Sequence, residues 1–169
     1  MGTADRGFRG LARKGAGGSS DSGQLLHEAT THAILGGFFR VYNELGAGFV
    51  EGVYARALAI ELEARGLHVE CEVPVSVYFR GVEVGRFRAD LIVDCQVLVE
   101  LKAAEALVAA HEQQVINYLS ATSLEVALLL NFGPKASFKR LVLTNTHKTY
   151  RWYPRWFSGP RPRVSAVCS

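Results

Sequence analysis

The chain has 169 residues, of which 49% are hydrophobic, and it carries 19 basic and 16 acidic side chains for a net charge of +3. It is long enough for one domain with a hydrophobic core and too short for two domains of ordinary size. It has neither a run of about 18 apolar residues, which a transmembrane helix needs, nor the apolar leader of a secreted protein. We therefore expect a cytoplasmic protein with no membrane partner.

The chain divides into three parts by composition. Residues 1–23 are rich in Gly, Ser and Arg and hold too few large apolar residues to offset the entropy of ordering, which predicts a disordered tail. Residues 24–146 are expected to form the single domain, and because they hold 10 basic and 14 acidic side chains, net charge does not predict a nucleic-acid-binding core. Residues 147–169 form a basic, aromatic C-terminal tail. It can clamp single-stranded nucleic acid by stacking, or it can be an extension without a role.

Two helices are predicted at the start of the domain. Apolar residues recur at helical spacing over residues 24–45 and again over residues 51–65. Glu51 stands in the first turn of the second helix. A carboxylate is favoured there by the helix dipole for purely structural reasons, so its position alone does not indicate a functional role.

Strands are predicted in the middle of the chain. Residues 69–79 alternate between apolar and polar, residues 82–88 follow a turn, and the apolar runs 91–93 and 97–99 indicate a hairpin. Four antiparallel strands are therefore expected.

A helix over residues 107–122, a buried strand over residues 126–132 and an edge strand over residues 140–144 complete the prediction. The expected fold is α/β (α+β), a central mixed sheet flanked by helices. One face of the third helix carries a polar stripe, which is formed by His111, Gln114 and Tyr118.

Three charged residues, Asp90, Glu100 and Lys102, lie in the otherwise apolar hairpin. Buried charges need one another, a metal ion or water. Glu100 and Lys102 project to the same side of their strand because side chains alternate with period two. A three-residue loop at 94–96 would place Asp90 opposite Glu100, whereas a two-residue loop would turn Asp90 to the wrong face.

An Asp, a Glu and a Lys that converge on one point of a sheet suggest a site for a hard cation, because Mg²⁺ takes oxygen ligands and keeps several waters. A water beside both the metal and the ammonium group can serve as a nucleophile, and the same charges stabilise a pentavalent phosphorus centre. An ordinary salt bridge on an edge strand is the alternative interpretation of this pattern.

The order of these elements, together with the charged residues, resembles the PD-(D/E)XK nuclease superfamily. Within it, the chain looks like the GxxExxY protein family, whose motif stands here as Gly48-Phe49-Val50-Glu51-Gly52-Val53-Tyr54. Gln114 and Tyr118 also match the Q-x-x-x-Y element of the RecB-like branch, whereas Ala89 stands where the family has a proline. The similarity runs from about Ile34 to Thr144 and includes Arg88-Ala89-Asp90, Glu100-Leu101-Lys102, His111-Glu112-Gln113-Gln114, Asn117-Tyr118-Leu119 and Asn131-Phe132-Gly133.

This resemblance implies a restriction-endonuclease-like core and a nuclease that needs Mg²⁺, with Mn²⁺ as the alternative cation. Such an enzyme would hydrolyse the phosphodiester bonds of nucleic acid, DNA in the first place, by attack of a metal-activated water. The resemblance makes the metal ligands Asp90, Glu100, Glu51 and the Leu101 carbonyl. Lys102 would polarise the water, Gln114 would orient the substrate or Lys102, and Tyr118 and His111 would join Gln114 in substrate binding.

A second class of function remains open at this point. Fold does not imply function, so the same scaffold can serve a non-catalytic accessory protein that binds nucleic acid or another protein. The complete Asp-Glu-Lys set argues against this reading, because a scaffold has no need of Lys102 at its position. The sequence also allows a homodimer.

Overall fold

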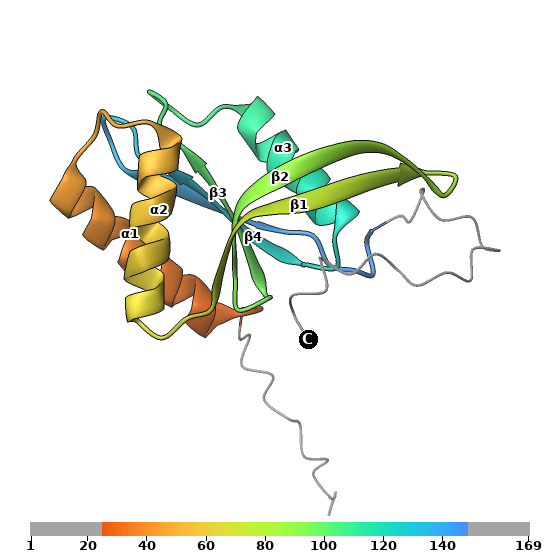
Figure 1. Ribbon diagram of the computed structural model, residues 1–169, viewed down its shortest axis with the longest axis horizontal. Helices are drawn as coiled ribbons and strands as arrows, with labels where there is room; N and C mark the ends of the chain where they lie inside the picture. Colours follow the sequence, from red (N-terminus) through yellow and green to blue (C-terminus); the bar gives the residue numbers. More distant parts are fainter. Residues whose placement is uncertain (1–24, 149–169) are drawn as a thin grey trace, which may run out of the picture.

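The computed structural model describes residues 25–148, so the predicted N-terminal tail lies outside them, as does the C-terminal tail from residue 149 onward. A five-stranded mixed sheet stands between helices, as the predicted α/β fold class requires (Figure 1). No helix in this part of the chain is long and apolar enough to cross a membrane. The elements in chain order are α1 (Glu28–Leu45), α2 (Glu51–Ala64), β1 (Val69–Phe79), β2 (Val82–Val93), β3 (Val97–Lys102), α3 (Ala109–Ala121), β4 (Val126–Asn131) and β5 (Ser137–Val142).

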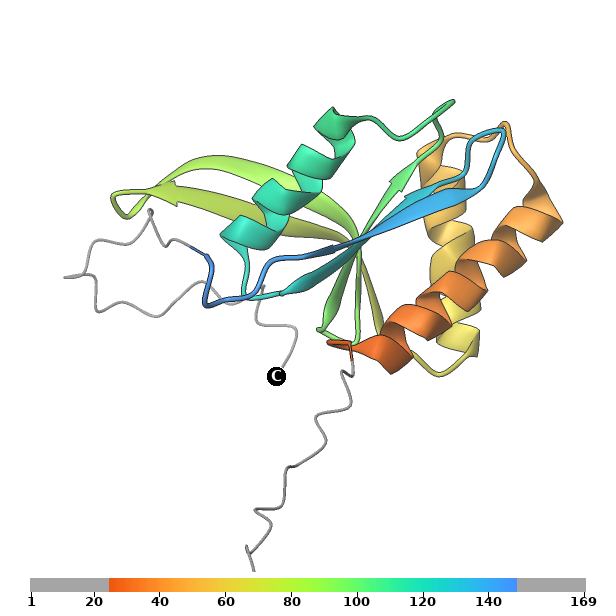
Figure 2. The same cartoon turned by 180° about the vertical axis from the view of Figure 1, so that it is seen from behind.

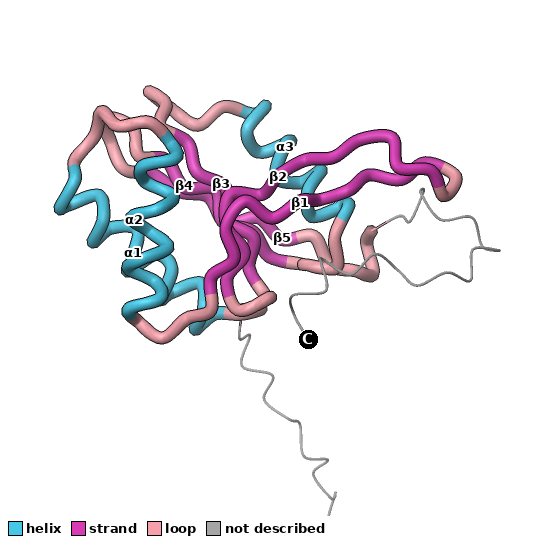
Figure 3. Tube along the Cα trace, viewed as in Figure 1, coloured by secondary structure: helices cyan, strands magenta, loops and turns pink. Residues whose placement is uncertain are grey.

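The helices bury both faces of the sheet. Helices α1 and α2 lie together on one side of the strands and α3 lies on the other (Figure 3). Strands β3 and β4 are apolar except near their C-terminal ends and are buried along nearly their whole length, as expected of strands that are covered on both faces. Their alternate residues therefore belong to two cores, one under α1 and α2 and one under α3.

The strand order is β1-β2-β3-β4-β5, and only β3 and β4 run parallel. A parallel pair needs a crossover, which here contains α3. The predicted mixed sheet is therefore confirmed. The crossover also places α3 on the face of the sheet whose core includes Ala89, Ile92 and Leu98 of β2 and β3.

Two details of the predicted strands are wrong. Residues 69–102 form three antiparallel strands instead of four, because β2 is continuous from Val82 to Val93 and pairs with β1 on both sides of Asp90. The last strand is Ser137–Val142 instead of 140–144, since its pairing with β4 begins at Asn131 and Ser137, straight after the turn.

The loop between β2 and β3 has the length that the functional interpretation requires. Val93 pairs with Val97, which leaves residues 94–96 as a three-residue loop. Asp94 and Cys95 both have a left-handed backbone, with φ of 51° and 55°. Asp tolerates this conformation, and its Oδ1 accepts a hydrogen bond of 2.9 Å from the His68 backbone N–H.

Strands β2 and β3 part at the level of Asp90. Their ladder runs from Val93 to Leu91 and ends there, whereas β2 continues to pair with β1 as a two-stranded ribbon. The ribbon extends well beyond the rest of the sheet, past α3 (Figures 1 and 2). Glu72, which lies between two paired positions of β1 and opposite Asp90, has a φ of 51° and interrupts the ladder locally.

Candidate active site

Asp90 and Glu100 stand where β2 and β3 part. The last pair of the ladder is Leu91 with Val99, so the next pair in the same register is Asp90 with Glu100. Asp90 Oδ2 accepts a hydrogen bond of 2.7 Å from the backbone N–H of Leu101. The side chain of Asp90 therefore spans the gap between the two strands, and its carboxyl group lies against β3.

Glu100 forms a nearly buried ion pair with Lys102. Lys102 Nζ donates to Glu100 Oε1 at 2.8 Å, and the two side chains are only 13% and 4% exposed. The second oxygen, Glu100 Oε2, is buried and has no hydrogen-bond partner among the described residues. Buried polar atoms are nearly always paired, so this carboxylate oxygen can accept a ligand.

The negative charges of Asp90 and Glu100 are not balanced by nearby positive charge. Burial, and next the charge of Asp90, raise the pKa of Glu100 to about 7 although Lys102 opposes them. Burial likewise raises the pKa of Asp90, against the hydrogen bond from Leu101 and the charge of Lys102. One lysine therefore does not balance the buried carboxylates, and the site favours an additional positive charge.

Lys102 itself is held protonated. Burial alone would lower its pKa, but the hydrogen bond and charge of Glu100, with the charges of Glu51 and Asp90, outweigh burial and raise the pKa. A cationic group is thus fixed beside the two carboxyl groups at neutral pH.

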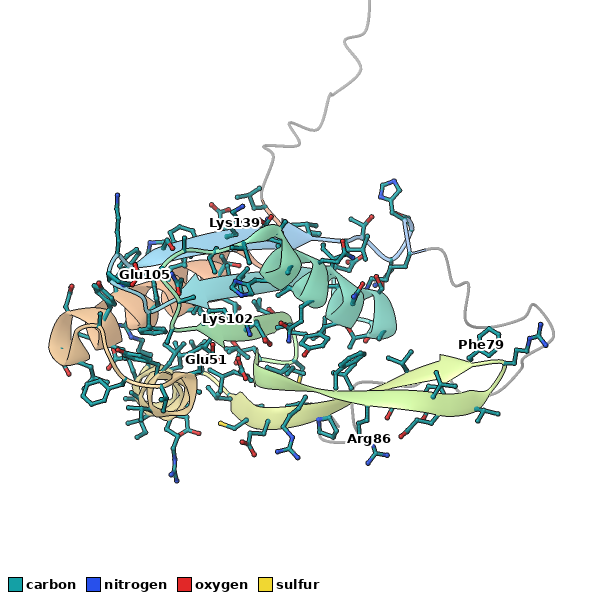
Figure 4. All side chains as sticks on the ribbon, turned by 90° about the horizontal axis from the view of Figure 1, so that it is seen from above. Glu51, Phe79, Arg86, Lys102, Glu105 and Lys139 are labelled. Atoms are coloured by element: carbon teal, nitrogen blue, oxygen red, sulfur yellow. The ribbon has the colours of Figure 1, made fainter. Side chains whose placement is uncertain are left out.

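Glu51 reaches this cluster electrostatically. It is the first residue of α2 and is exposed, and its charge contributes to raising the pKa of Asp90, Glu100 and Lys102. Figure 4 shows the Glu51 and Lys102 side chains as neighbours in the view from above. Within residues 25–148, however, no three His, Cys, Asp or Glu side chains form a group that could hold a metal ion. That Glu51 is a further ligand stays a prediction.

The polar stripe of α3 borders the cluster. Gln114 Nε2 donates to the Tyr118 hydroxyl at 2.7 Å. Burial raises the pKa of Tyr118 against this hydrogen bond, and the charge of Glu100 raises it further. Phe87 of the ribbon contacts the Tyr118 ring with centroids 5.3 Å apart. His111 is engaged differently, because its Nδ1 accepts a hydrogen bond of 3.4 Å from Val108 N–H at the start of α3.

A hard divalent cation fits these donors. Asp90 and Glu100 supply carboxylate oxygens, one of which lacks a partner, and Mg²⁺ is commonly held by one or two carboxylates while it keeps several waters. The residues that could hold it are Asp90, Glu100 and the Leu101 carbonyl. Soft metals are not favoured, since the cluster offers neither Cys nor His.

Two residues have contacts at this site that sequence reasoning did not assign. Tyr54 and Asn131 were assigned no role at the site, yet both are completely buried and accept hydrogen bonds from the backbone of Phe49 and Ala104, two residues from Glu51 and Lys102. For Asn131, the signal in the sequence was a polar residue inside an apolar segment.

Comparison with known proteins identifies the superfamily of this chain through one family model. No curated protein matches the chain. A solved structure titled "Crystal structure of SSO0001" shares 18% identity and a TM-score of 0.41, and the match covers 68% of this chain and 65% of that one. The PD-(D/E)XK nuclease superfamily, whose members are generally nucleases that typically use divalent metals, matches residues 28–141. This range holds Glu51, Asp90, Glu100 and Lys102, and the chain therefore belongs to the PD-(D/E)XK nuclease superfamily.

Proposed function

We propose that the protein is a Mg²⁺-dependent nuclease that hydrolyses phosphodiester bonds, with DNA as its substrate. The observation that carries the proposal is the pair of carboxyl groups of Asp90 and Glu100 beside the Lys102 ammonium, where β2 and β3 part. Both carboxyl groups have a raised pKa, so a bound divalent cation would relieve their repulsion.

Four groups of the chain would act at the cation and the phosphate. Asp90 and Glu100, with the Leu101 carbonyl, would hold the cation. When bound, the cation would supply a Lewis acid that polarises the phosphate and lowers the pKa of water. Lys102, which is protonated, would donate a hydrogen bond to a phosphate oxygen and stabilise the negative charge that develops on it.

Two further groups would assist from the neighbouring helices. Glu51 adds negative charge at the start of α2, which would strengthen the attraction of the site for a cation. Gln114, held by the Tyr118 hydroxyl, would orient the substrate along the face of α3. Mn²⁺ would serve in place of Mg²⁺, since carboxylate and carbonyl oxygens suit both ions.

The test compares Asp90→Asn with a matched variant, Asp94→Asn. Both substitutions replace a carboxylate of the same hairpin by an amide of the same shape, and both leave an oxygen to accept the native backbone hydrogen bond, from Leu101 or from His68. Calorimetry would measure Mg²⁺ binding, and a labelled DNA oligonucleotide would report cleavage with and without EDTA. Only Asp90→Asn should lose both binding and cleavage; an Asp90→Asn protein that cuts at the wild-type rate would overturn the proposal.

A non-catalytic binding role is the second candidate. The close ion pair between Lys102 and Glu100, and the lack of three grouped ligand side chains within the described residues, also fit a site that only stabilises the fold. In that case the wild type would neither bind Mg²⁺ nor cut the oligonucleotide. Retention of the same DNA in a gel-shift assay would then support an accessory protein.

A further inference from the structure

The end of β4 holds the backbone from Lys102 to Ala104 by hydrogen bonds. Asn131 pairs with Lys102 in the parallel ladder and is completely buried. Its side chain uses both polar atoms on one residue, since Oδ1 accepts from Ala104 N–H at 3.0 Å and Nδ2 donates to the Ala104 carbonyl at 2.9 Å. Phe132 N–H donates to the Lys102 carbonyl at 2.7 Å. The backbone is therefore pinned both at Lys102 and two residues beyond it.

Glycine at position 133 lets the chain after β4 lie this close to Ala104. A Cβ at this position would lie 1.9 Å from the Ala104 carbonyl oxygen, which is backbone and cannot swing aside. Only glycine lets two backbones approach so closely. Two residues of the segment Asn131-Phe132-Gly133 are therefore explained: Asn131 by its hydrogen bonds and Gly133 by the close approach of the two backbones.

Phe132, the remaining residue of the segment, is explained by the ring of Tyr54, which stacks on it. The two rings are nearly parallel, at 14°, with centroids 4.3 Å apart. The Tyr54 hydroxyl donates to the Gly46 carbonyl at 2.7 Å and accepts from Phe49 N–H at 3.1 Å. It thereby closes the loop that precedes α2.

This loop determines where Glu51 stands. Helix α2 starts at Glu51, and its N-cap residue, Val50, makes no side-chain capping hydrogen bond. Gly48 holds the loop in a backbone with φ of 116°, which favours glycine. The hydroxyl of Tyr54, one turn into the helix, is thus the polar group that fixes the chain on both sides of Gly48.

Glu51 and Lys102 are therefore tied to one buried unit. They come from different elements, yet the segment that carries each of them is held by Tyr54 or Asn131, and the two holders meet through Phe132. We call the set Tyr54, Asn131, Phe132 and Gly133 the clasp. Functional groups must be held within about 0.5 Å of the productive geometry, and a displacement of about 1 Å can cost about 100-fold in rate.

We propose that Tyr54 and Asn131 are positioning residues, which set the places of Glu51 and Lys102 through the backbone segments that the clasp holds. This inference rests on the proposed nuclease function, since neither residue lies at the carboxyl pair itself. The positioning role explains why a tyrosine stands at the end of the Gly48-to-Tyr54 motif and why the segment Asn131-Phe132-Gly133 has these residue types, although none of these residues would take part directly in the reaction.

The first test uses Tyr54→Phe with Tyr78→Phe as its matched control. Each substitution removes one tyrosine hydroxyl, but Tyr78 lies near the end of β1, in the ribbon, and is not part of the clasp. We expect Tyr54→Phe to lower kcat on a labelled DNA oligonucleotide about 10- to 100-fold with an unchanged KM. Tyr78→Phe should keep the wild-type kcat. Equal kcat values for the two variants would overturn the positioning role.

The second test separates positioning by Asn131 from loss of stability. Asn131→Ala is compared with Leu130→Ala, its completely buried neighbour in β4. Both should lower the urea midpoint of unfolding, but only Asn131→Ala should lower kcat at a temperature where both are folded. A fall in kcat that follows the urea midpoint in both variants would show that Asn131 is merely structural.

Amide hydrogen exchange keeps this inference distinct from the proposed function. Tyr54→Phe should speed exchange of the Phe49 amide, and Asn131→Ala should speed exchange of the Ala104 amide, because each amide loses its hydrogen-bond acceptor. Each rate should exceed the rate of the same amide in the control variant at least 10-fold. If the wild type cuts no nucleic acid, the proposed function fails, and this local exchange still supports the clasp. Unchanged exchange at both amides would overturn the clasp whatever the activity.

Discussion

Replacing Glu100 by glutamine should stabilise the metal-free protein above neutral pH. The Glu100 side chain is only 4% exposed, and burial together with the charge of Asp90 raises its pKa from 4.5 to about 7. At about 1.4 kcal/mol for each pH unit, ionised Glu100 costs the folded state about 3 kcal/mol. Glutamine has nearly the same shape and can still accept a hydrogen bond from Lys102, but it carries no charge.

The sign of the pH dependence follows from proton binding. Between about pH 4.5 and pH 7 the folded protein keeps a proton on Glu100 that the unfolded chain has released. The stability that this proton contributes is complete below about pH 4.5 and is lost as the pH rises through about 7. The free energy of unfolding of Glu100→Gln should therefore match that of the wild type near pH 4.5 and exceed it by about 3 kcal/mol at pH 8.

Urea unfolding in EDTA at several pH values from 4.5 to 8 would measure this difference. Glu105→Gln is the matched control, because Glu105 is an exposed carboxylate on the same segment, and its substitution should change stability by a constant amount across the series. Mg²⁺ at about 100 times its Kd should then stabilise the wild type at pH 8 by about 2.7 kcal/mol and the Glu100→Gln protein by less. A pH-independent difference between wild type and Glu100→Gln would refute the reasoning that the site is short of positive charge.

Three other changes have distinct expected results. Lys102→Met should lower kcat about 100- to 1000-fold on a DNA oligonucleotide but leave Mg²⁺ binding in calorimetry largely intact; loss of binding would make Lys102 a structural residue. Gly133→Ala should lower the free energy of unfolding by about 1–3 kcal/mol, whereas Gly52→Ala, where an added Cβ meets nothing within 4 Å, should be neutral or stabilising in the same urea assay. Deleting residues 150–169 should weaken DNA binding and flatten its salt dependence without changing kcat at saturation, if the tail holds nucleic acid; an unchanged salt slope would exclude that role.

The local pattern of side chains was enough to predict most elements of this fold. Helical spacing predicted α1, α2 and α3, and uninterrupted apolar runs predicted the buried strands β3 and β4. Periodicity also linked Asp90 to Glu100, because side chains alternate along a strand and only an odd loop keeps both on one side. The observed pairing of Val93 with Val97 confirms that loop.

Strand continuity and strand ends were not decided by local pattern. Residues 82–88 and 91–93 were expected as separate strands, yet they form one strand, β2, because β1 pairs with it on both sides of Asp90. Likewise β5 begins where β4 offers partners, at Ser137, before its own apolar residues accumulate. The left-handed backbone at Glu72, which interrupts the ladder opposite Asp90, has no signature in the sequence.

What the sequence by itself determined was therefore the set of elements and the chemical groups of the site, since periodicity records which neighbours along the chain share a face. Tertiary structure alone decided how those groups are held. Tyr54 meets Phe132, and Asn131 meets Ala104, only because the sheet and α2 pack in one particular arrangement. Such contacts join residues distant in the chain, and no repeat or spacing in a single sequence specifies which buried polar atom will find which backbone group.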